Sequence, residues 1–210
     1  MKKTSPIRIL IADDHYVVRM GLIAMVNLEP DMEVVAEATD GNQATALFKR
    51  FNPDLTLLDV RMPVKNGIEA VTEIRQQNKD ARILMLSALD GDEDIHKAMV
   101  AGASGYVLKD STEDKLLPAI RAVAAGQRWI PKDVARRLAA RQLFEELTQR
   151  ELLILNKVVK GLANKQIADV LNISENTVKW HLKNILAKLS VADRAEAVAV
   201  AIQRGIIHFQ

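Results

Sequence analysis

The sequence has 210 residues, of which 49% are hydrophobic and 27% are charged, a composition typical of a soluble globular protein. It contains no cysteine, which excludes disulfides, thiolate metal sites and cysteine nucleophiles. The apolar runs are too short to cross a membrane, and the N-terminus does not read as a signal peptide. We therefore expect a cytoplasmic protein with no membrane partner.

The charge is divided unevenly along the chain. Residues 1–127 hold 15 lysines and arginines against 19 aspartates and glutamates, a net charge of −4. Residues 128–210 hold 14 basic against 8 acidic residues, a net charge of +6. An acidic half joined to a basic half indicates two roles, and the basic half is a candidate for contact with a phosphate backbone.

The first half alternates short apolar runs with stretches of helical periodicity. The runs that predict strands are 7–12, 34–36, 55–58, 83–86 and 106–108. The stretches that predict helices are 16–28, 41–51, 67–75, 95–100 and 115–125. Five βα units with continuously apolar strands are typical of an α/β fold, here a doubly wound, flavodoxin-like parallel sheet of five strands.

The second half contains no strand-like run and is predicted to be all-α. Its expected helices are 135–143, 148–159, 165–171, 175–189 and 194–202. Thr148, Asn164, Ser174 and Asp193 are the expected N-terminal caps or breaks. We divide the chain into a first domain over 1–127, a helical linker over 128–146 and a four-helix domain over 147–210.

Polar side chains follow the predicted strands of the first domain. Asp13 and Asp14 end the first strand and Asp59 the third, whereas Ser87 and Lys109 end the fourth and fifth. Ligands of such sheets bind at the carboxyl ends of the strands, so these groups should meet at one rim. His15 is interpreted as a partly exposed residue of the same rim.

This set of groups matches the needs of phosphoryl transfer. Three clustered carboxylates repel one another, and a hard cation such as Mg²⁺ relieves the repulsion. The cation and Lys109 would neutralise the charge on a transferred phosphoryl group, and Asp59 is the natural nucleophile. The alternative for any single aspartate is a helix cap, as Asp14 could be for the first helix.

Over residues 7–127 the sequence resembles the receiver domains of response regulators. The motifs that carry the resemblance are Asp13-Asp14-His15, Leu57-Leu58-Asp59, Met62-Pro63 with Gly67, Leu86-Ser87-Ala88, and Gly105-Tyr106 with Lys109. Many receivers have proline after this lysine. Here Asp110 follows it, which argues against the cis peptide of those receivers.

The resemblance implies a role for each residue of the rim. Asp59 accepts a phosphoryl group from a sensor histidine kinase and is the only catalytic residue. Mg²⁺ or Mn²⁺ is bound by Asp14, Asp59 and the main-chain carbonyl of Arg61, with Asp13 acting through water. Ser87 bonds the phosphoryl group, Tyr106 swings inward as a switch, and Lys109 pairs with the phosphate.

The helices expected at 165–171 and 175–189 have the spacing of a helix-turn-helix. The second of them is amphipathic. Its apolar positions are Val178, Leu182, Ile185, Leu186 and Leu189, and Lys179, Lys183 and Lys188 lie on or near the opposite face. A helix that enters the DNA major groove needs this arrangement, although a lysine face alone is more often only a solvated surface.

Residues 146–208 resemble the DNA-binding domain of LuxR/NarL/FixJ-type regulators. The motifs are Leu147-Thr148 with Arg150-Glu151, Gly161 with Asn164-Lys165 and Ile167-Ala168, and Ser174 with Thr177-Val178-Lys179-Trp180-His181-Leu182-Lys183-Asn184-Ile185. The resemblance implies that Lys179, Trp180 and Lys183 face the groove. Lys165, Thr177 and Asn184 are candidate phosphate contacts. The last helix is implied to be a dimer surface, with alanines at 195, 197, 199 and 201.

Together, the two halves predict a DNA-binding transcriptional response regulator of a two-component phosphorelay. Phosphorylation of Asp59 is expected to promote homodimerisation and binding to double-stranded promoter DNA, with RNA polymerase as a further partner. One alternative is a phosphatase or mutase with an aspartyl-phosphate intermediate, but the short 61–66 loop offers no cap domain. The other is a DNA-binding protein whose receiver is never phosphorylated, which would predict a missing member of the acidic set.

Overall fold

The computed structural model describes residues 5–87, 91–141 and 145–207. The chain divides into two compact units. The first is Met1–Asp90 with Ile95–Ala135, and the second is Gly91–Asp94 with Arg136–Gln210. Each unit has its own core, so each is described separately below.

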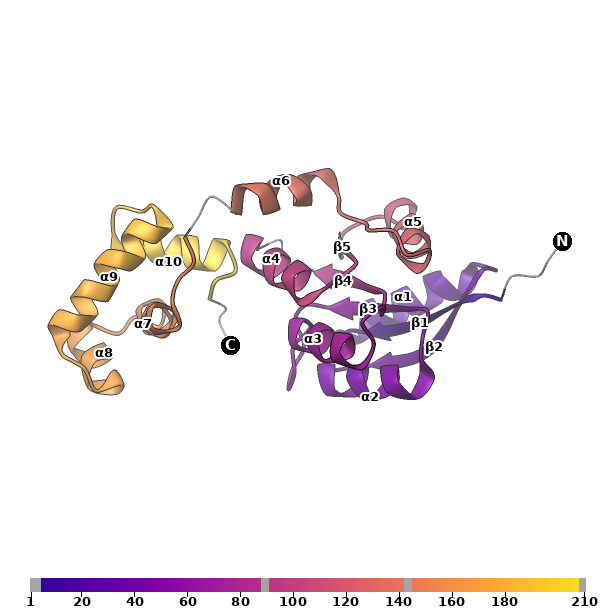
Figure 1. The fold of residues 1–210 in the computed structure, drawn as a ribbon, viewed down its shortest axis with the longest axis horizontal. Helices are drawn as coiled ribbons and strands as arrows, with labels where there is room; N and C mark the ends of the chain where they lie inside the picture. Colours follow the sequence, from indigo (N-terminus) through magenta and orange to yellow (C-terminus); the bar gives the residue numbers. More distant parts are fainter. Residues whose placement is uncertain (1–4, 88–90, 142–144, 208–210) are drawn as a thin grey trace. The chain divides into compact units, whose positions relative to one another are not determined.

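The first unit is built from alternating strands and helices, as predicted (Figure 1). Its strands are β1 (Ile7–Ala12), β2 (Met32–Ala38), β3 (Leu55–Asp59), β4 (Ile83–Ser87) and β5 (Gly105–Leu108). The helices of this half of the chain are α1 (Tyr16–Leu28), α2 (Gly41–Phe51), α3 (Gly67–Gln77), α4 (Asp92–Ala101) and α5 (Glu113–Ala124). The sequence pattern located every element, and the remaining differences are a few residues at the ends.

The five strands are parallel and lie in the order β2-β1-β3-β4-β5. The chain leaves β1 first toward β2 and then crosses to β3 on the other side of β1. The strand order therefore reverses between β1 and β3, and a crevice for ligands forms at the carboxyl ends of strands at such a reversal. The predicted doubly wound sheet is confirmed.

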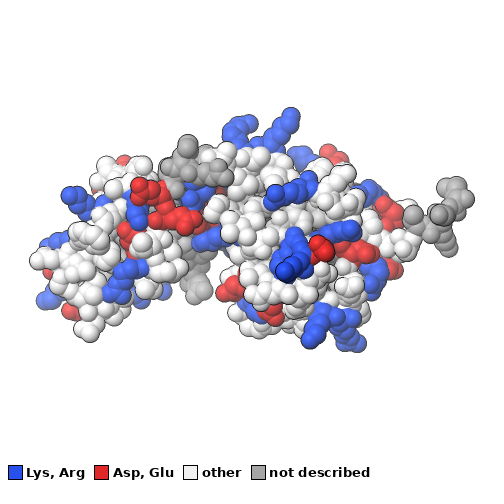
Figure 2. Space-filling model, in the orientation of Figure 1, with Lys and Arg blue, Asp and Glu red and all other residues white. Residues whose placement is uncertain are grey.

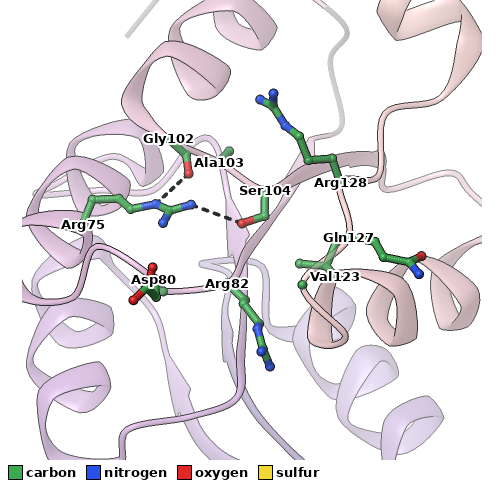
Figure 3. Close-up of a pocket in the computed structure, with 11 residues that line it drawn as sticks. Arg75, Asp80, Arg82, Gly102, Ala103, Ser104, Val123, Gln127 and Arg128 are labelled. Carbon is green, nitrogen blue, oxygen red and sulfur yellow. Dashed lines mark hydrogen bonds between the residues drawn. The ribbon is translucent and has the colours of Figure 1, made fainter.

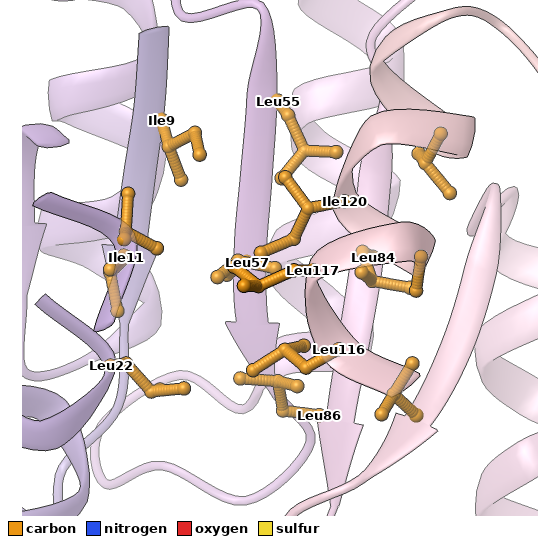
Figure 4. Packing of buried hydrophobic residues seen from close by; sticks show 14 of the residues in the cluster. Ile9, Ile11, Leu22, Leu55, Leu57, Leu84, Leu86, Leu116, Leu117 and Ile120 are labelled. Carbon is orange, nitrogen blue, oxygen red and sulfur yellow. The ribbon is translucent and has the colours of Figure 1, made fainter. Parts of the chain in front are cut away.

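A single aliphatic cluster joins the sheet to α1 and α5. Leu116, Leu117 and Ile120 of α5 pack over Leu57 and its neighbours on the sheet (Figure 4). Every residue of β3 and β4 is buried, which explains why these two strands read as continuous apolar runs rather than alternating ones. With aromatics at only 4% of the sequence, the core is mainly aliphatic.

The segment after α5 begins differently from the helical linker that we predicted. Trp129 forms a parallel bridge with Gly105 at the open edge of β5. The Tyr106 N–H donates to the Trp129 carbonyl (2.9 Å), and the Trp129 N–H donates to the Ser104 carbonyl (3.2 Å). The backbone here continues the sheet, and helix starts only at α6 (Lys132–Arg141). Positions 142 and 143 of the predicted helix lie outside the described residues.

The second unit contains α7 (Gln149–Val159), α8 (Asn164–Leu171), α9 (Glu175–Leu189) and α10 (Arg194–Gln203), which share one apolar core. Thr148, Ser174 and Asp193 are N-caps whose side chains accept main-chain N–H groups, as predicted. Asn164 is not a cap. It is the first residue of α8, and Ala163 occupies the cap position.

Two other expectations concern the backbone and the membrane. The described residues contain no cis peptide bond, in agreement with Asp110 standing where many receivers have proline. None of the helices within the described ranges is both long and apolar enough to cross a membrane.

Candidate functional site

The carboxyl ends of β1, β3, β4 and β5 bring the predicted rim residues together. Asp13 directly follows β1, Asp59 is the last residue of β3, Ser87 is the last residue of β4, and Lys109 directly follows β5. Asp13 is completely buried, and only 2% of Asp59 is exposed. Two buried carboxylates therefore lie at the point where the strand order reverses.

Lys109 bridges these two carboxylates. Its Nζ lies 2.7 Å from Asp13 Oδ2 and 2.8 Å from Asp59 Oδ2. Because a buried carboxylate without a partner is costly, this ammonium group compensates for the two acids that the fold has placed side by side. The main chain of Lys109 is fixed beside the end of β4, because its N–H donates to the Ser87 carbonyl at 2.8 Å.

The pocket changes the protonation equilibria of its groups. Burial raises the pKa of Asp59 to about 6, although the hydrogen bond and charge of Lys109 act in the opposite direction and Asp13 adds repulsion. Burial also works against the charge of Lys109, but its hydrogen bonds to Asp13 and Asp59 outweigh that effect and raise its pKa. The lysine therefore stays charged, and excess negative charge remains on the carboxylate side.

An acidic cluster of three carboxylates and one histidine, partly buried and partly exposed, includes Asp59. Asp13, Asp14, His15 and Asp59 can each offer one ligand atom, and these atoms all lie within 4.8 Å of one another. Asp14 and His15 are exposed, and His15 Nδ1 lies 2.8 Å from Asp14 Oδ1. Asp14 does not cap α1, because the cap position belongs to His15. The cluster offers hard oxygen ligands that suit a divalent cation, so its residues fit the metal that the sequence implied.

The remaining predicted residues of this site lie on the same rim or just beneath it. The Arg61 N–H donates to Asp59 Oδ1 at 3.3 Å, so the Arg61 main chain is next to the acceptor carboxylate. Ser87 is buried at the end of β4. Tyr106 is fully buried in β5, with its ring turned inside the unit.

Arg19 is a supporting residue that sequence reasoning missed. It is 8% exposed and is the only charged residue of α1. Its guanidinium donates to the Asp13 carbonyl at 2.8 Å and to Glu37 of β2 at 3.0 Å. Arg19 thus ties the end of β1 to α1 and β2. A single charged residue within a mostly apolar helix was the signal that could have identified it.

The loop after Asp59 depends on Gly67. A Cβ atom added at Gly67 would lie 1.9 Å from the Asp59 carbonyl oxygen, so any larger residue would displace the loop from the acceptor. The same loop holds Val64 at φ 66°, in the left-handed region that β-branched residues rarely adopt. The Val64 side chain is 84% exposed. The 61–66 loop is thus held in a conformation that its own sequence does not favour.

In the second unit, α9 has the two faces that the sequence predicted. Val178, Ile185 and Leu189 are buried in the core. Lys179 and Lys183 are exposed, and Trp180 is 60% exposed. The ring of His181 packs edge-on against Trp180, with ring centroids 4.8 Å apart. An exposed indole between two lysines is thus presented at the surface, where it can meet a ligand.

The other predicted contacts are near the turn between α8 and α9 or farther along α9. Lys165 is exposed near the start of α8, and Thr177 and Asn184 are partly buried on α9. Ser174 Oγ accepts the Thr177 N–H at 3.0 Å and hydrogen-bonds the Thr177 hydroxyl at 2.8 Å. The end of this unit that contains α8 and α9 carries several lysine and arginine side chains, drawn in blue (Figure 2). The N-terminus of α9 and the lysines therefore provide a basic surface.

Lys188 corrects one detail of the predicted lysine face. Its Nζ lies 2.9 Å from Glu151 Oε2 and donates to the Glu146 carbonyl, so it belongs to the internal structure of the unit. Burial would raise the pKa of Glu151, but hydrogen bonds from Lys188 and from Thr148 outweigh burial and lower it. Lys188 therefore holds α9 against the start of α7.

Replacing Lys188 with methionine should destabilise the second unit by about 1–3 kcal/mol at pH 7, because Glu151 would lose its charged partner while staying buried. Because the pKa of Glu151 is lower in the folded than in the unfolded protein, this carboxylate stabilises the fold at pH values above its unfolded pKa, about 4.3. The stabilisation disappears as the pH falls through the folded-state pKa. The difference between variant and parent should therefore shrink below about pH 4.

Urea unfolding between pH 3 and 7, followed by Trp180 fluorescence in a Trp129→Phe background, measures this effect. Lys160→Met removes an exposed lysine of the same unit and should change the free energy of unfolding little. A Lys188→Met penalty that stays constant down to pH 3 would argue that the lysine stabilises only through its aliphatic chain.

The dimer surface proposed from the alanines of α10 needs correction. Ala197 and Ala201 are buried in the core of their own unit, whereas Ala195 and Ala199 are exposed. Residues two apart lie on nearly opposite sides of a helix, so these four alanines cannot form one face. A surface on α10 would use Ala195, Ala199 and the 41%-exposed Ile202 instead.

Comparisons with known proteins match one family model to each half of the chain. The family model described as "Response regulator receiver domain" matches residues 9–121, and "Bacterial regulatory proteins, luxR family" matches residues 145–201.

Two curated relatives and one solved structure are similar over nearly the full chain. The chain is 41% identical to the nitrate/nitrite response regulator protein NarP of Escherichia coli K12, over 97% of this chain and 98% of NarP. It is 35% identical to the response regulator protein VraR of Staphylococcus aureus NCTC 8325, over 96% and 99%. The crystal structure of the response regulator ChrA, from a heme-sensing two-component system, is 37% identical with a TM-score of 0.59, covering 97% of this chain and 100% of ChrA.

Proposed function

This chain belongs to the response regulators that join a receiver domain to a LuxR-type DNA-binding domain, and on that premise we propose that phosphorylation of Asp59 controls its binding to promoter DNA. The phosphoryl group would come from a sensor histidine kinase. The observation that carries the proposal is the buried pair of Asp13 and Asp59 bridged by Lys109 at the carboxyl ends of the strands.

The acceptor step needs a carboxylate oxygen with access to a phosphorus atom. An Asp59 oxygen forms a bond to phosphorus, the bond between phosphorus and the donor group breaks, and the donor leaves with that electron pair. The product is an acyl phosphate on Asp59. Lys109 already lies against Asp59 Oδ2, and its ammonium would stabilise the negative charge on the transferred oxygens.

The acidic cluster would hold a divalent cation, Mg²⁺ or Mn²⁺, through Asp14, Asp59 and the Arg61 main-chain carbonyl, with Asp13 acting through water. When bound, the cation would supply positive charge against the acidic pocket and the phosphoryl oxygens. Arg19 holds the Asp13 main chain through its carbonyl, and the Arg61 N–H donates to Asp59 Oδ1. The chain therefore contributes a pre-positioned acceptor and one fixed ammonium group.

Phosphorylation would redistribute the contacts of Lys109. Before phosphorylation the ammonium is shared between two carboxylates. A phosphoryl group brings additional negative charge, so it would draw Lys109, and Ser87 would donate to it. Lys109 directly follows β5, which also holds Tyr106, so a change at Asp59 can reach that strand directly.

In the second unit, we assign DNA contact to the exposed side of α9. Lys179, Trp180 and Lys183 would face the major groove, and Lys165, Thr177 and Asn184 would contact phosphates. Lys179 forms an ion pair with Glu175 at 2.9 Å in this structure, so DNA must compete with that carboxylate. Both side chains are well exposed, so the ion pair is weak and a DNA phosphate or base can replace Glu175 at little cost.

Selecting DNA from a random pool with the full chain, with and without acetyl phosphate and Mg²⁺, tests the proposed function. We expect the phosphorylated protein to enrich inverted half-sites about one helical turn apart, as a dimer would. The unphosphorylated protein should enrich the same sequence weakly. An identical enrichment in both samples would contradict control by phosphorylation, and no enriched sequence would contradict specific DNA binding.

Replacing Lys109 with alanine should abolish the gain in DNA affinity on phosphorylation, because the phosphoryl group would lack its ammonium partner. The same variant leaves Asp13 and Asp59 buried without compensation, and breaking a buried ion pair costs up to about 3–5 kcal/mol. A bound cation would replace part of the lost charge. Added Mg²⁺ should therefore raise the Tm of Lys109→Ala more than that of the parent protein.

Calorimetry with and without Mg²⁺, and DNA titrations with and without acetyl phosphate, measure the two effects. Lys115→Ala, which removes an exposed lysine at the start of α5, is the matched control. If Lys109→Ala gains DNA affinity like the parent, the lysine has no part in signalling. If Mg²⁺ raises the Tm of both proteins equally, the cation does not replace the charge that Lys109 supplies to the carboxylates.

A further inference from the structure

A hollow lies in the first unit at the opposite edge of the sheet from Asp59. It has a volume of about 640 Å³ and lies at the amino ends of β4 and β5, lined by the end of α3 and the loops that enter these strands. This volume is within the range of small-molecule pockets in proteins. The segment that follows α5 closes its remaining side.

Three arginines line this hollow with one aspartate, Asp80. Arg75 points into it between Gly102 and Ser104, and Arg82 and Arg128 stand on opposite sides of it (Figure 3). These charged side chains sum to +2. Arg75, Asp80 and Arg82 belong to residues 1–127, whose net charge is −4, and Arg128 directly follows that range. Positive charge is thus concentrated here against the charge of its surroundings.

The hydrogen-bond acceptors of Arg75 and Arg82 in the described structure are uncharged. Arg75 donates to the carbonyls of Gly102 (2.8 Å) and Lys79 and to Ser104 Oγ (3.3 Å), all uncharged acceptors. Arg82 donates to the Ala124 carbonyl. In the part of the chain that the structure describes, none of the three forms an ion pair with a carboxylate. By contrast, Arg19 and Arg121 of the same unit pair with acidic side chains.

Hydrogen-bond donors remain available in the hollow. Arg75 uses three of its five N–H groups, so about two are left for a ligand. Ser104 Oγ accepts hydrogen bonds from Arg75 and from the Ile83 N–H, which leaves its own O–H to donate elsewhere. Arg75 is held in place by its main-chain acceptors, and such a fixed guanidinium is suited to binding an anion.

We propose that this hollow binds a small multivalent anion, a phosphate ester or oligophosphate. Guanidinium groups match phosphate oxygens in geometry and charge, and a net charge of +2 suits an anion with at least two negative charges. A recessed hollow of this size admits a small molecule, whereas a duplex would reach only its rim. The site does not include Asp59 or α9, so the proposal stands independently of the proposed function.

Titrating the ¹⁵N-labelled full chain with inorganic tripolyphosphate, followed by amide NMR, tests the proposal. We expect saturable shifts at Gly102, Ser104 and Gly126, which line the hollow. Arg82→Gln with Arg128→Gln should weaken this binding at least about tenfold, because two exposed charges are lost. Both residues are exposed, so the fold should be retained.

Lys49→Gln with Arg50→Gln removes the same charge from the end of α2 and is the matched control. Equal affinity in the two double variants would overturn the proposal, since only diffuse electrostatic attraction would remain. Shifts confined to the basic second unit would overturn it as well. If a random-sequence duplex moves the three amides and tripolyphosphate does not, the surface contacts nucleic acid and the small-ligand site is refuted.

Discussion

Replacing Asp59 with asparagine should abolish phosphorylation completely. Acetyl phosphate with Mg²⁺ should add one phosphoryl group to the parent chain and none to Asp59→Asn, as seen by intact-mass spectrometry. The reason is chemical, since an amide oxygen cannot form the acyl phosphate. Omitting Mg²⁺ should also stop the reaction in the parent chain, because the acidic cluster would repel an anionic donor.

The variant should remain folded, so that the result can be attributed to the acceptor. Burial already favours the neutral form of Asp59, and a neutral amide removes its repulsion with Asp13. The Tm of Asp59→Asn should therefore equal or exceed that of the parent chain. Asp114→Asn, on the exposed side of α5, should be phosphorylated normally. A label that persists on Asp59→Asn would assign the acceptor role to another residue.

Replacing Lys179 and Lys183 together with alanine should nearly eliminate specific DNA binding. The two lysines are one turn apart on the exposed face of α9, on either side of Trp180. If Lys179 reads a base edge, its loss costs about 1–3 kcal/mol on the preferred site and less on other sequences. If Lys183 contacts phosphate, its loss weakens all sequences alike and lowers the salt slope by about one.

Titrations of both single variants and of the double variant at several salt concentrations separate these contributions. Lys157→Ala with Lys160→Ala removes two lysines at the end of α7 and should have a much smaller effect. Glu175→Gln frees Lys179 from its ion pair and should raise affinity slightly. Unchanged binding by the Lys179→Ala, Lys183→Ala protein would refute α9 as the DNA-binding helix.

The order of elements could be read from the sequence because local patterns dictate it. The ends of α1, α2 and α9 were predicted to the residue from apolar periodicity and from breaks in it, both of which are local features. The first and last rim residues, Asp13 and Lys109, were predicted because a parallel βα sheet necessarily brings the carboxyl ends of its strands to one edge.

Properties that depend on distant parts of the chain could not be predicted in the same way. The buried partner of Lys188 is Glu151, 37 residues earlier, so only the folded structure shows that Lys188 does not belong to the predicted lysine face of α9. The alanines of α10 were assigned to one surface, yet packing against α7 and α9 buries two of them. Trp129 continues the sheet beside β5, a pairing for which the linker sequence carries no local signal.

The sequence by itself determined the five βα units, the helix-turn-helix and the positions of the candidate residues on them, because each depends on periodicity or on position at a strand end. The tertiary structure alone decided which charges are compensated. It paired Lys109 with two buried carboxylates and bonded Arg19 to the Asp13 main-chain carbonyl. Among the described residues, it left Arg75, Arg82 and Arg128 around a hollow without an ion pair to a carboxylate. The physical reason is that compensation depends on distances of a few ångströms between side chains far apart in sequence, which no local pattern encodes.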